Sequence, residues 1–196
     1  MNCRSRFISP MTQSQLIQHI SAFDKYVKVV KLRSEIKAQS FSLRELVDLT
    51  FYPDKVIAIK AARLLERVLL KFPQIYCEDI GYFFEQAGDV KSQSIKRFYA
   101  KIIMFITSPE IPKDVRNKVK EINLERVIEI CFDWMVDSNM LISVRAASSV
   151  ALFNLRHRYP WIAEELSKQL EYIVRDTTPA MLAKADMILS YLHCED

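Results

Sequence analysis

The chain has very little glycine: only two of its 196 residues, Gly81 and Gly88. Tight β-hairpins and loops that bind phosphate groups both rely on glycine, because it tolerates backbone conformations that other residues avoid. Its scarcity disfavours β architectures and nucleotide-binding turns. The composition therefore favours helices.

Paired cysteines are also lacking. Cys3, Cys77, Cys131 and Cys194 lie far apart, and no two of them form the Cys-x-x-Cys pair of many zinc and redox sites. The three histidines are scattered as well. We therefore expect no metal and no cofactor, and isolated reduced thiols of the kind found inside cells.

Long apolar runs are missing too. The longest tight cluster, Ile102 to Ile106, is far shorter than the roughly 20 residues that a membrane-spanning helix needs. No apolar run follows Arg4 and Arg6 to complete a signal peptide. These observations predict a cytoplasmic protein without a membrane partner.

Charge is only mildly uneven along the chain. The formal net charge is +4, with +6 in residues 1–98 and −2 in residues 99–196. This asymmetry allows an anionic partner but is too small to argue for nucleic acid. A hydrophobic content of 50% excludes a disordered chain. We expect one domain over residues 1–196, acting as a monomer or a weak dimer.

What the chain does contain is a repeat. Residues 59–73, 95–109 and 144–160 each begin with an apolar residue followed by a basic one and end at a proline. With a fourth copy near the C-terminus, the basic residues Lys60, Lys96, Arg145 and Lys184 follow at intervals of 36, 49 and 39 residues. Such self-similarity is typical of stacked helical hairpins.

Helix signals divide the chain further. Helical spacing begins at Thr12 and continues to Ile36, Ser42 and Glu45 form a capping box, and Asp54 caps the next helix. We expect residues 1–11 to be flexible and residues 108–122 to be an insertion with one or two helical turns. The four predicted helical hairpins are 42–51 with 54–72, 74–86 with 90–107, 123–137 with 140–158, and 160–175 with 179–193.

The register resembles that of HEAT and armadillo repeats. Inner HEAT helices often carry Asp, then Val and Arg, and this chain matches with Asp54-Ile59-Lys60 and Asn139-Val144-Arg145. The resemblance implies an all-α fold, an α-α superhelix of about four hairpins. It also implies that the concave face, lined by the second helix of each hairpin, docks a protein partner.

The aligned cations are the first candidate binding residues. If the helices stack in parallel, Lys60, Lys96, Arg145 and Lys184 form a ladder that meets acidic side chains or phosphates. The alternative is structural, with each cation reaching a loop carbonyl or a cap residue of a neighbouring repeat. A nucleic-acid binder would use Lys60, Lys96, Arg97, Lys101 and Arg145 on phosphates.

A tryptophan beside two carboxylates is the second candidate. Asp133, Trp134 and Asp137 share a helical stretch, and this cluster loosely resembles the site of HEAT-like alkylpurine DNA glycosylases. In those enzymes aromatic side chains flank an alkylated base and an Asp assists its departure. The spacing here is one residue shorter than in that family. The alternative places Trp134 in the core and Asp137 at a helix cap.

Two further aromatics follow the third hairpin. Arg156, His157 and Arg158 precede Tyr159 and Trp161, which combine a large contact area with a polar tip and can anchor a partner. The alternative is that both aromatics pack the third hairpin onto the fourth. The cations are explained by the negative end of the preceding helix.

The segments 129–135 and 158–162 resemble the C-terminal half of a little-studied group of bacterial proteins of similar length. Members are helical and HEAT-like, and some carry the name adenylosuccinate lyase. That enzyme family uses the loop Ser-Ser-x-Met-Pro-x-Lys-x-Asn-Pro, whereas Ser148-Ser149 here is followed by Val150-Ala151. The sequence therefore favours a non-enzymatic interaction or scaffold module, with nucleic-acid binding and lyase activity as the alternatives.

Overall fold

A computed structural model describes residues 12–21, 41–175 and 177–195. Within these ranges the chain forms ten α-helices and three 3-10 helices, and no strand. The predicted all-α fold is confirmed. The expected flexible residues 1–11, and the predicted helical spacing from residue 22 to Ile36, lie outside the described residues.

Contacts group the chain into two compact units, Met1–Lys71 and Phe72–Asp196. The first unit contains α1 (Gln13–Ser21), α3 (Leu43–Asp48), the 3-10 helix η1 (Leu49–Phe51) and α4 (Lys55–Lys71). Helix α4 contacts all three of the other elements. It can do so because its buried side chains recur every three or four residues along one side: Ala58, Ala61, Ala62, Leu64, Leu65, Val68 and Leu69.

Local capping sets the helix starts of this unit. The Ser42 hydroxyl accepts a hydrogen bond from the Glu45 backbone N–H at 3.1 Å, and the Glu45 carboxylate accepts one from the Ser42 N–H at 3.0 Å. Asp54 accepts hydrogen bonds from the N–H groups of Val56 and Ile57. Both predicted caps are confirmed, and each satisfies backbone donors that a helix start leaves free.

Replacing Ser42 by alanine is expected to lower the free energy of unfolding of the first unit by about 1 kcal/mol, because one N-terminal backbone donor of α3 loses its acceptor. The measurement is urea unfolding followed by circular dichroism. Ser143→Ala serves as the control, since Ser143 is exposed and lies inside a helix. Equal stability of Ser42→Ala and the parent protein would contradict the capping argument.

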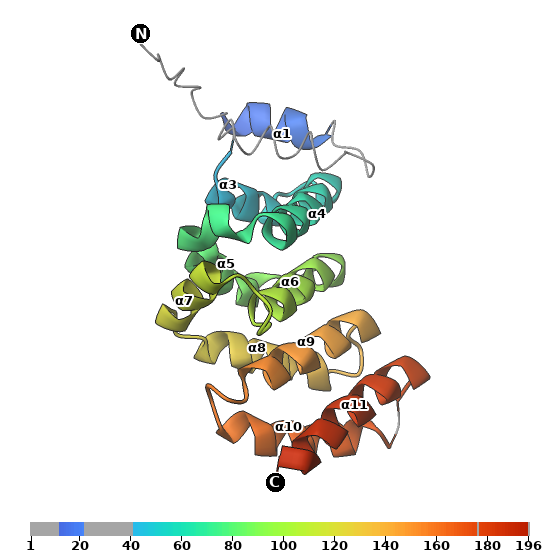
Figure 1. Ribbon diagram of the computed structural model, residues 1–196. Coiled ribbons are helices and arrows are strands. Elements are labelled where there is room, and N and C mark those ends of the chain that lie inside the picture. Colours follow the sequence, from blue (N-terminus) through green and yellow to red (C-terminus); the bar gives the residue numbers. More distant parts are fainter. Residues whose placement is uncertain (1–11, 22–40, 176, 196) are drawn as a thin grey trace. The chain divides into compact units, whose positions relative to one another are not determined.

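The second unit is a stack of hairpins. Its elements are η2 (Pro73–Asp79), α5 (Ile80–Gln86), η3 (Ala87–Asp89), α6 (Gln93–Ile106), α7 (Lys113–Glu121), α8 (Glu125–Val136), α9 (Ile142–Leu155), α10 (Trp161–Ile173) and α11 (Pro179–Glu195). Figure 1 shows α5, α8 and α10 succeeding one another in one layer, and α6, α9 and α11 in the other.

Helix α9 lies at the centre of this unit, where it contacts α6, α8, α10 and α11. Small side chains make such close packing possible, and Ala147, Ser148, Ser149 and Ala151 are all buried. The hairpin order agrees with the predicted pairs 123–137 with 140–158 and 160–175 with 179–193. The boundaries differ by only a few residues.

Two segments differ from their predicted form. Residues 74–86 were expected to be one helix, but the 3-10 helix η2 comes first, with a kink at the buried Tyr76, and α5 begins only at Ile80. Packing of the Tyr76 ring overrides the local pattern there. Residues 108–122, expected to be an insertion with one or two helical turns, contain the somewhat longer helix α7 of two and a half turns.

Burial gives the repeat register directly. Five positions face the protein in each repeat, at relative places 0, 4, 7, 8 and 11 counted from Ala61, Ile95, Val144 and Met181 of the second helices. All are buried except Leu189 and Phe72, which are half-buried, and Phe72 directly follows the last residue of α4. The intervals are 34, 49 and 37 residues. Lys96 and Arg145 are therefore equivalent, whereas Lys60 and Lys184 stand two residues away from the equivalent positions, Ala62 and Leu182.

Candidate protein-interaction site

Two of the four predicted ladder cations bind helix ends. Lys60 of α4 donates a hydrogen bond to the carbonyl of Ser21, the last residue of α1. Arg145 is 8% exposed, and its Nε donates to the carbonyl of Met135 near the end of α8 at 2.9 Å. The last four carbonyls of a helix lack partners within it, and cations are favoured there. Both contacts fit the structural alternative.

The other two ladder cations, Lys96 and Lys184, do not bind helix ends and differ from each other in their contacts. The Lys96 ammonium lies 5.6 Å from the ring centre of Trp134, at cation–π distance. Lys184 is half-buried on α11, with its ammonium 4.0 Å from the sulfur of Met187. The four predicted ladder residues thus have four different surroundings. Only Lys96 and Arg145 occupy equivalent places.

Trp134 is a packed side chain with 5% exposure. The carboxylate of Asp137 accepts a hydrogen bond from the Asn139 N–H at 2.9 Å in the turn before α9, and Asp133 is exposed. A base-binding site would need the aromatic and a carboxylate to share an open cleft. The contacts instead fit the core and cap roles.

Tyr159 and Trp161 lie where the third hairpin meets the fourth. The Leu124 backbone N–H donates a hydrogen bond to the Tyr159 hydroxyl at 3.3 Å, at the start of α8. The Trp161 ring is 52% exposed and stacks on Phe132 with ring centres 5.9 Å apart. Both aromatics therefore make contacts between hairpins. The outer side of Trp161 remains open to solvent.

The exposed side of α6, α9 and α11 forms one surface, which we call the second-helix face. It contains Arg97, Lys101 and Met104 of α6, Ala146, Val150 and Phe153 of α9, and Ala183, Met187 and Tyr191 of α11. Phe153 and Tyr191 connect two of these helices, with ring centres 6.0 Å apart. Arg156 covers the Phe153 ring at 3.8 Å.

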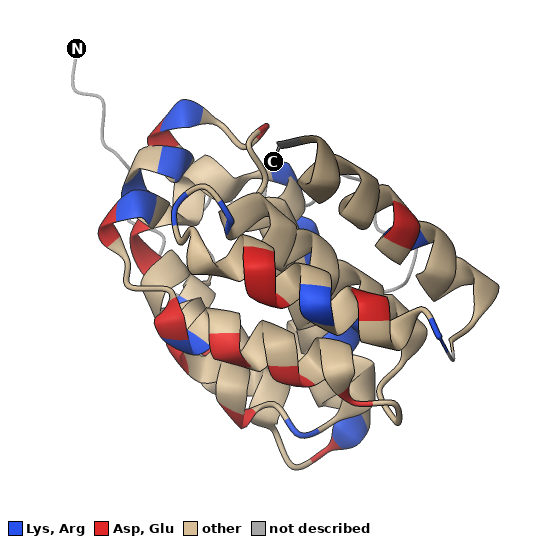
Figure 2. Ribbon diagram, turned by 90° about the horizontal axis from the view of Figure 1, so that it is seen from below, with Lys and Arg blue, Asp and Glu red and all other residues tan. Residues whose placement is uncertain are grey.

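Two cations of this face, Arg97 and Lys101, stand on α6, where Arg97 is exposed and lies against the Phe98 ring at 4.9 Å. A further cation, Arg156, lies over Phe153 at the end of α9. Helix α11 is mostly uncharged, as Figure 2 shows, and exposes 39% of Met187 and 57% of Tyr191. An apolar surface with cations along one side is complementary to an amphipathic segment that carries carboxylates.

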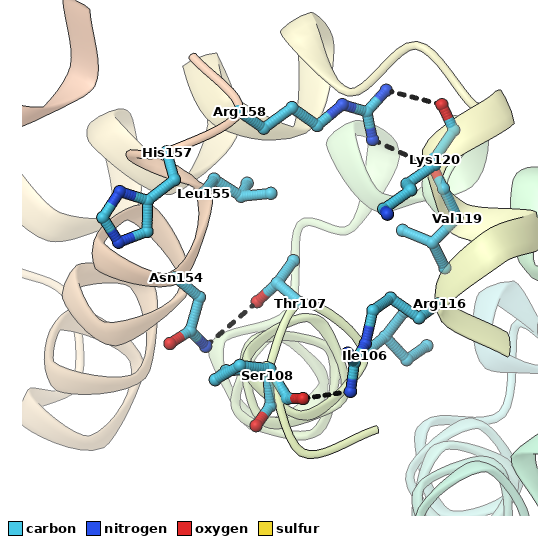
Figure 3. A pocket seen from close by; sticks show the side chains of 11 residues that line it. Ile106, Thr107, Ser108, Arg116, Val119, Lys120, Asn154, Leu155, His157 and Arg158 are labelled. Carbon is cyan, nitrogen blue, oxygen red and sulfur yellow. Dashed lines mark hydrogen bonds between the residues drawn. The ribbon is translucent and has the colours of Figure 1, made fainter. Parts of the chain in front are cut away.

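A pocket of about 170 Å³ opens at the ends of three helices in the same unit (Figure 3). Its lining residues come from the end of α6, from α7 and from the end of α9: Ile106, Thr107, Ser108, Pro109, Arg116, Val119, Lys120, Asn154, Leu155, His157 and Arg158. The end of α9 is 34 residues from the α7 part of the lining, so periodicity alone gave no signal for the pocket.

Arg158 was expected to complement the negative end of its own helix. It instead reaches the end of α7, where it donates to the carbonyls of Val119 at 3.0 Å, Lys120 at 3.1 Å and Ile122 at 2.7 Å. Arg116 of α7 donates to the carbonyls of Pro109 and Ile111. Arg158 therefore attaches the predicted insertion to the end of α9, and Arg116 holds the turn before α7 against the helix within the insertion.

Metal ligands and reactive thiols are groups on which many enzyme sites depend. No three His, Cys, Asp or Glu side chains in the described part of the chain approach closely enough to hold a metal ion. Burial raises the pKa of the Cys131 thiol to about 12, so this cysteine is not a ready nucleophile. None of the helices in the described ranges combines the length and apolarity required to cross a bilayer.

Comparison with known proteins identifies the repeat. No curated protein and no solved structure matches the chain. The HEAT repeat domain family does match, over residues 12–191. HEAT repeats commonly mediate contacts with other proteins, since stacked hairpins present an extended binding surface. With 180 of its 196 residues covered by this match and a fold of stacked helical hairpins, the chain belongs to the HEAT repeat domain family.

Proposed function

We propose that the chain is a non-enzymatic scaffold module that docks a partner protein on the second-helix face. One observation supports this most directly: cations on α6 lie beside apolar side chains on α9 and α11 that remain partly open to solvent. The occupant that fits is an amphipathic segment with apolar anchors and acidic residues on one edge. Residues 1–196 would act as one repeat domain, in line with the family match across both compact units.

The cations proposed for nucleic acid give less support to that alternative. Lys60 and Arg145 bind backbone carbonyls, and Lys96 lies over Trp134. Of the five cations in that proposal, Arg97 and Lys101 alone are exposed. Two neighbouring cations on one helix give too few phosphate contacts for strong binding.

Site-specific photo-crosslinking in cells tests the docking face. A photoreactive residue at position 187 on α11 is expected to capture a partner polypeptide, because this position lies in the face. The matched control is position 172 on α10, where Tyr172 is 71% exposed but belongs to the other layer. Capture at 172 and not at 187 would place the docking surface on the first helices instead.

Charge reversal then tests the partner's chemistry. With the captured partner purified, Arg97→Glu is expected to weaken binding by about tenfold or more, because a like charge would meet the acidic edge. Tyr172→Asp is expected to leave affinity unchanged. Unaltered affinity of Arg97→Glu would contradict an acidic occupant. Steeply salt-dependent binding of duplex DNA, lost in Arg97→Glu, would favour the nucleic-acid alternative.

A further inference from the structure

The pocket at the ends of α6, α7 and α9 has an unusual charge composition. Three of its lining side chains are cationic, Arg116, Lys120 and Arg158, and His157 adds an imidazole. None of the lining residues is acidic. No residue of the second-helix face lines the pocket, so this site is separate from the docking surface proposed above.

Two of the cations are held by the backbone, and the third is available. Arg116 donates to the carbonyl of Ile111, and Arg158 donates to the carbonyls of Val119 and Ile122 at the end of α7. The Lys120 ammonium makes no hydrogen bond or ion pair with any residue in the described ranges, and Figure 3 shows it directed towards the open centre of the pocket. The Nε of Arg116 is buried without a partner among the described residues, so the part of Arg116 that can act on a ligand in the pocket is its positive charge.

The charge balance of the pocket favours an anion. Three helices end at it, and each C-terminus contributes roughly half a unit of negative charge. Three cationic side chains exceed that sum by about one to two positive charges. The charge alone therefore calls for an anion, and the walls of the pocket decide which kind.

The walls and the volume narrow the class further. Ile106, Val119 and Leu155 give the pocket an apolar lining beside its donors. A cavity of about 150 Å³ holds a molecule the size of benzene, with six non-hydrogen atoms. The pocket is slightly larger, at about 170 Å³. A carboxylate on an aliphatic body of three or four carbons therefore fits.

We infer that this pocket binds the carboxylate of a short aliphatic acid, with the Lys120 ammonium as its donor and the charges of Arg116 and Arg158 in support. The same chemistry is present in a free small acid and at the C-terminal end of a polypeptide that finishes in an aliphatic residue. Arg158 and Asn154 hold the ends of α7 and α6 around the ligand, since both bind carbonyls there.

Nuclear magnetic resonance of the ¹⁵N-labelled full chain tests this assignment with sodium butyrate as the probe. Amide signals of Thr107, Lys120 and Leu155 are expected to shift together and to saturate. Butyramide, which has the same shape without the charge, is expected to bind at least tenfold more weakly. The peptide acetyl-Gly-Gly-Val, with a free C-terminus, distinguishes the two sources of the carboxylate. Tighter binding of the peptide than of butyrate would indicate a polypeptide C-terminus, and weaker binding would indicate a free small acid.

Lys120→Met keeps the aliphatic stem and is expected to weaken butyrate binding by about tenfold, because a charge-assisted hydrogen bond is lost. Lys113→Met is the matched control, since Lys113 is exposed at the other end of α7 and does not line the pocket. Equal binding of butyrate and butyramide, preferential binding of inorganic phosphate, or the absence of shifts with every probe would each overturn the inference.

Discussion

Replacing Trp134 by alanine is expected to lower the free energy of unfolding by about 3–5 kcal/mol, the usual cost of removing a large buried aromatic side chain. Trp134 is 5% exposed, and the Lys96 ammonium loses its ring partner in the same substitution. The free energy of unfolding is measured by urea unfolding of the full chain, monitored by circular dichroism. Thermal unfolding gives the melting temperature as a second measurement. Trp134→Phe is expected to recover part of the loss.

Trp161→Ala is the matched comparison, because the second tryptophan is 52% exposed and contacts mainly Phe132. Its loss is expected to cost only about 1 kcal/mol, the contribution of an exposed ring pair. Similar stabilities of Trp134→Ala and the parent protein would contradict the core role of Trp134. They would revive the interpretation of this side chain as a base-binding surface.

Arg145→Met is the substitution with the second largest expected effect. It keeps most of the aliphatic stem but removes the hydrogen bond from Nε to the Met135 carbonyl, which lies in a buried environment. Hydrogen bonds from charged donors are typically worth about 1.5–3 kcal/mol, so a loss of about 2 kcal/mol is expected. Thermal and urea unfolding both measure it.

The control for this prediction is Arg97→Met. Arg97 is exposed on α6, so its removal is expected to change stability by no more than about 0.5 kcal/mol. The two variants therefore separate a cation that stabilises the stack from one that is free to meet a partner. Equal losses from both would show that the hydrogen bond to Met135 contributes little.

Local signals allowed much of this fold to be predicted. The caps at Ser42 and Asp54 depend only on residues within three positions of them, so the sequence alone indicates where α3 and α4 begin. The end of α4 just before Pro73 follows in the same way, since proline lacks the donor that the next turn requires. Helix α9 ends at Leu155, well before Pro160, so that proline does not set its end. These features need no knowledge of the tertiary structure.

The candidate sites were harder to predict. The spacing of Lys60, Lys96, Arg145 and Lys184 suggested one ladder, but long flexible side chains reach different targets, and burial shows that only two of the four are equivalent. A basic residue is a poor register mark because it tolerates many positions on a helix surface. Buried apolar positions are better marks, since each must fill a fixed space.

The pocket lay beyond sequence reasoning for a different reason. The end of α9 is more than thirty residues from α7, and it meets the neighbouring segments at the end of α6 and on α7 only because α7 turns back against the stack. Arg158 could be noticed as a cation at a helix end, yet its targets belong to another helix. Contacts between elements so distant in sequence depend on the stacking geometry.

Arg158 holds the end of α7, and Arg116 holds the turn before it. These contacts determine which residues of α7 can be replaced without loss of the structure. Both arginines bind main-chain carbonyls, which every amino acid possesses, so the attachment does not depend on which side chains the gripped residues carry. The residues at exposed positions of α7 can therefore be substituted while these hydrogen bonds keep the helix in place. Recognition of new ligands could evolve on this helix, at Lys120 above all, without rebuilding the scaffold beneath it.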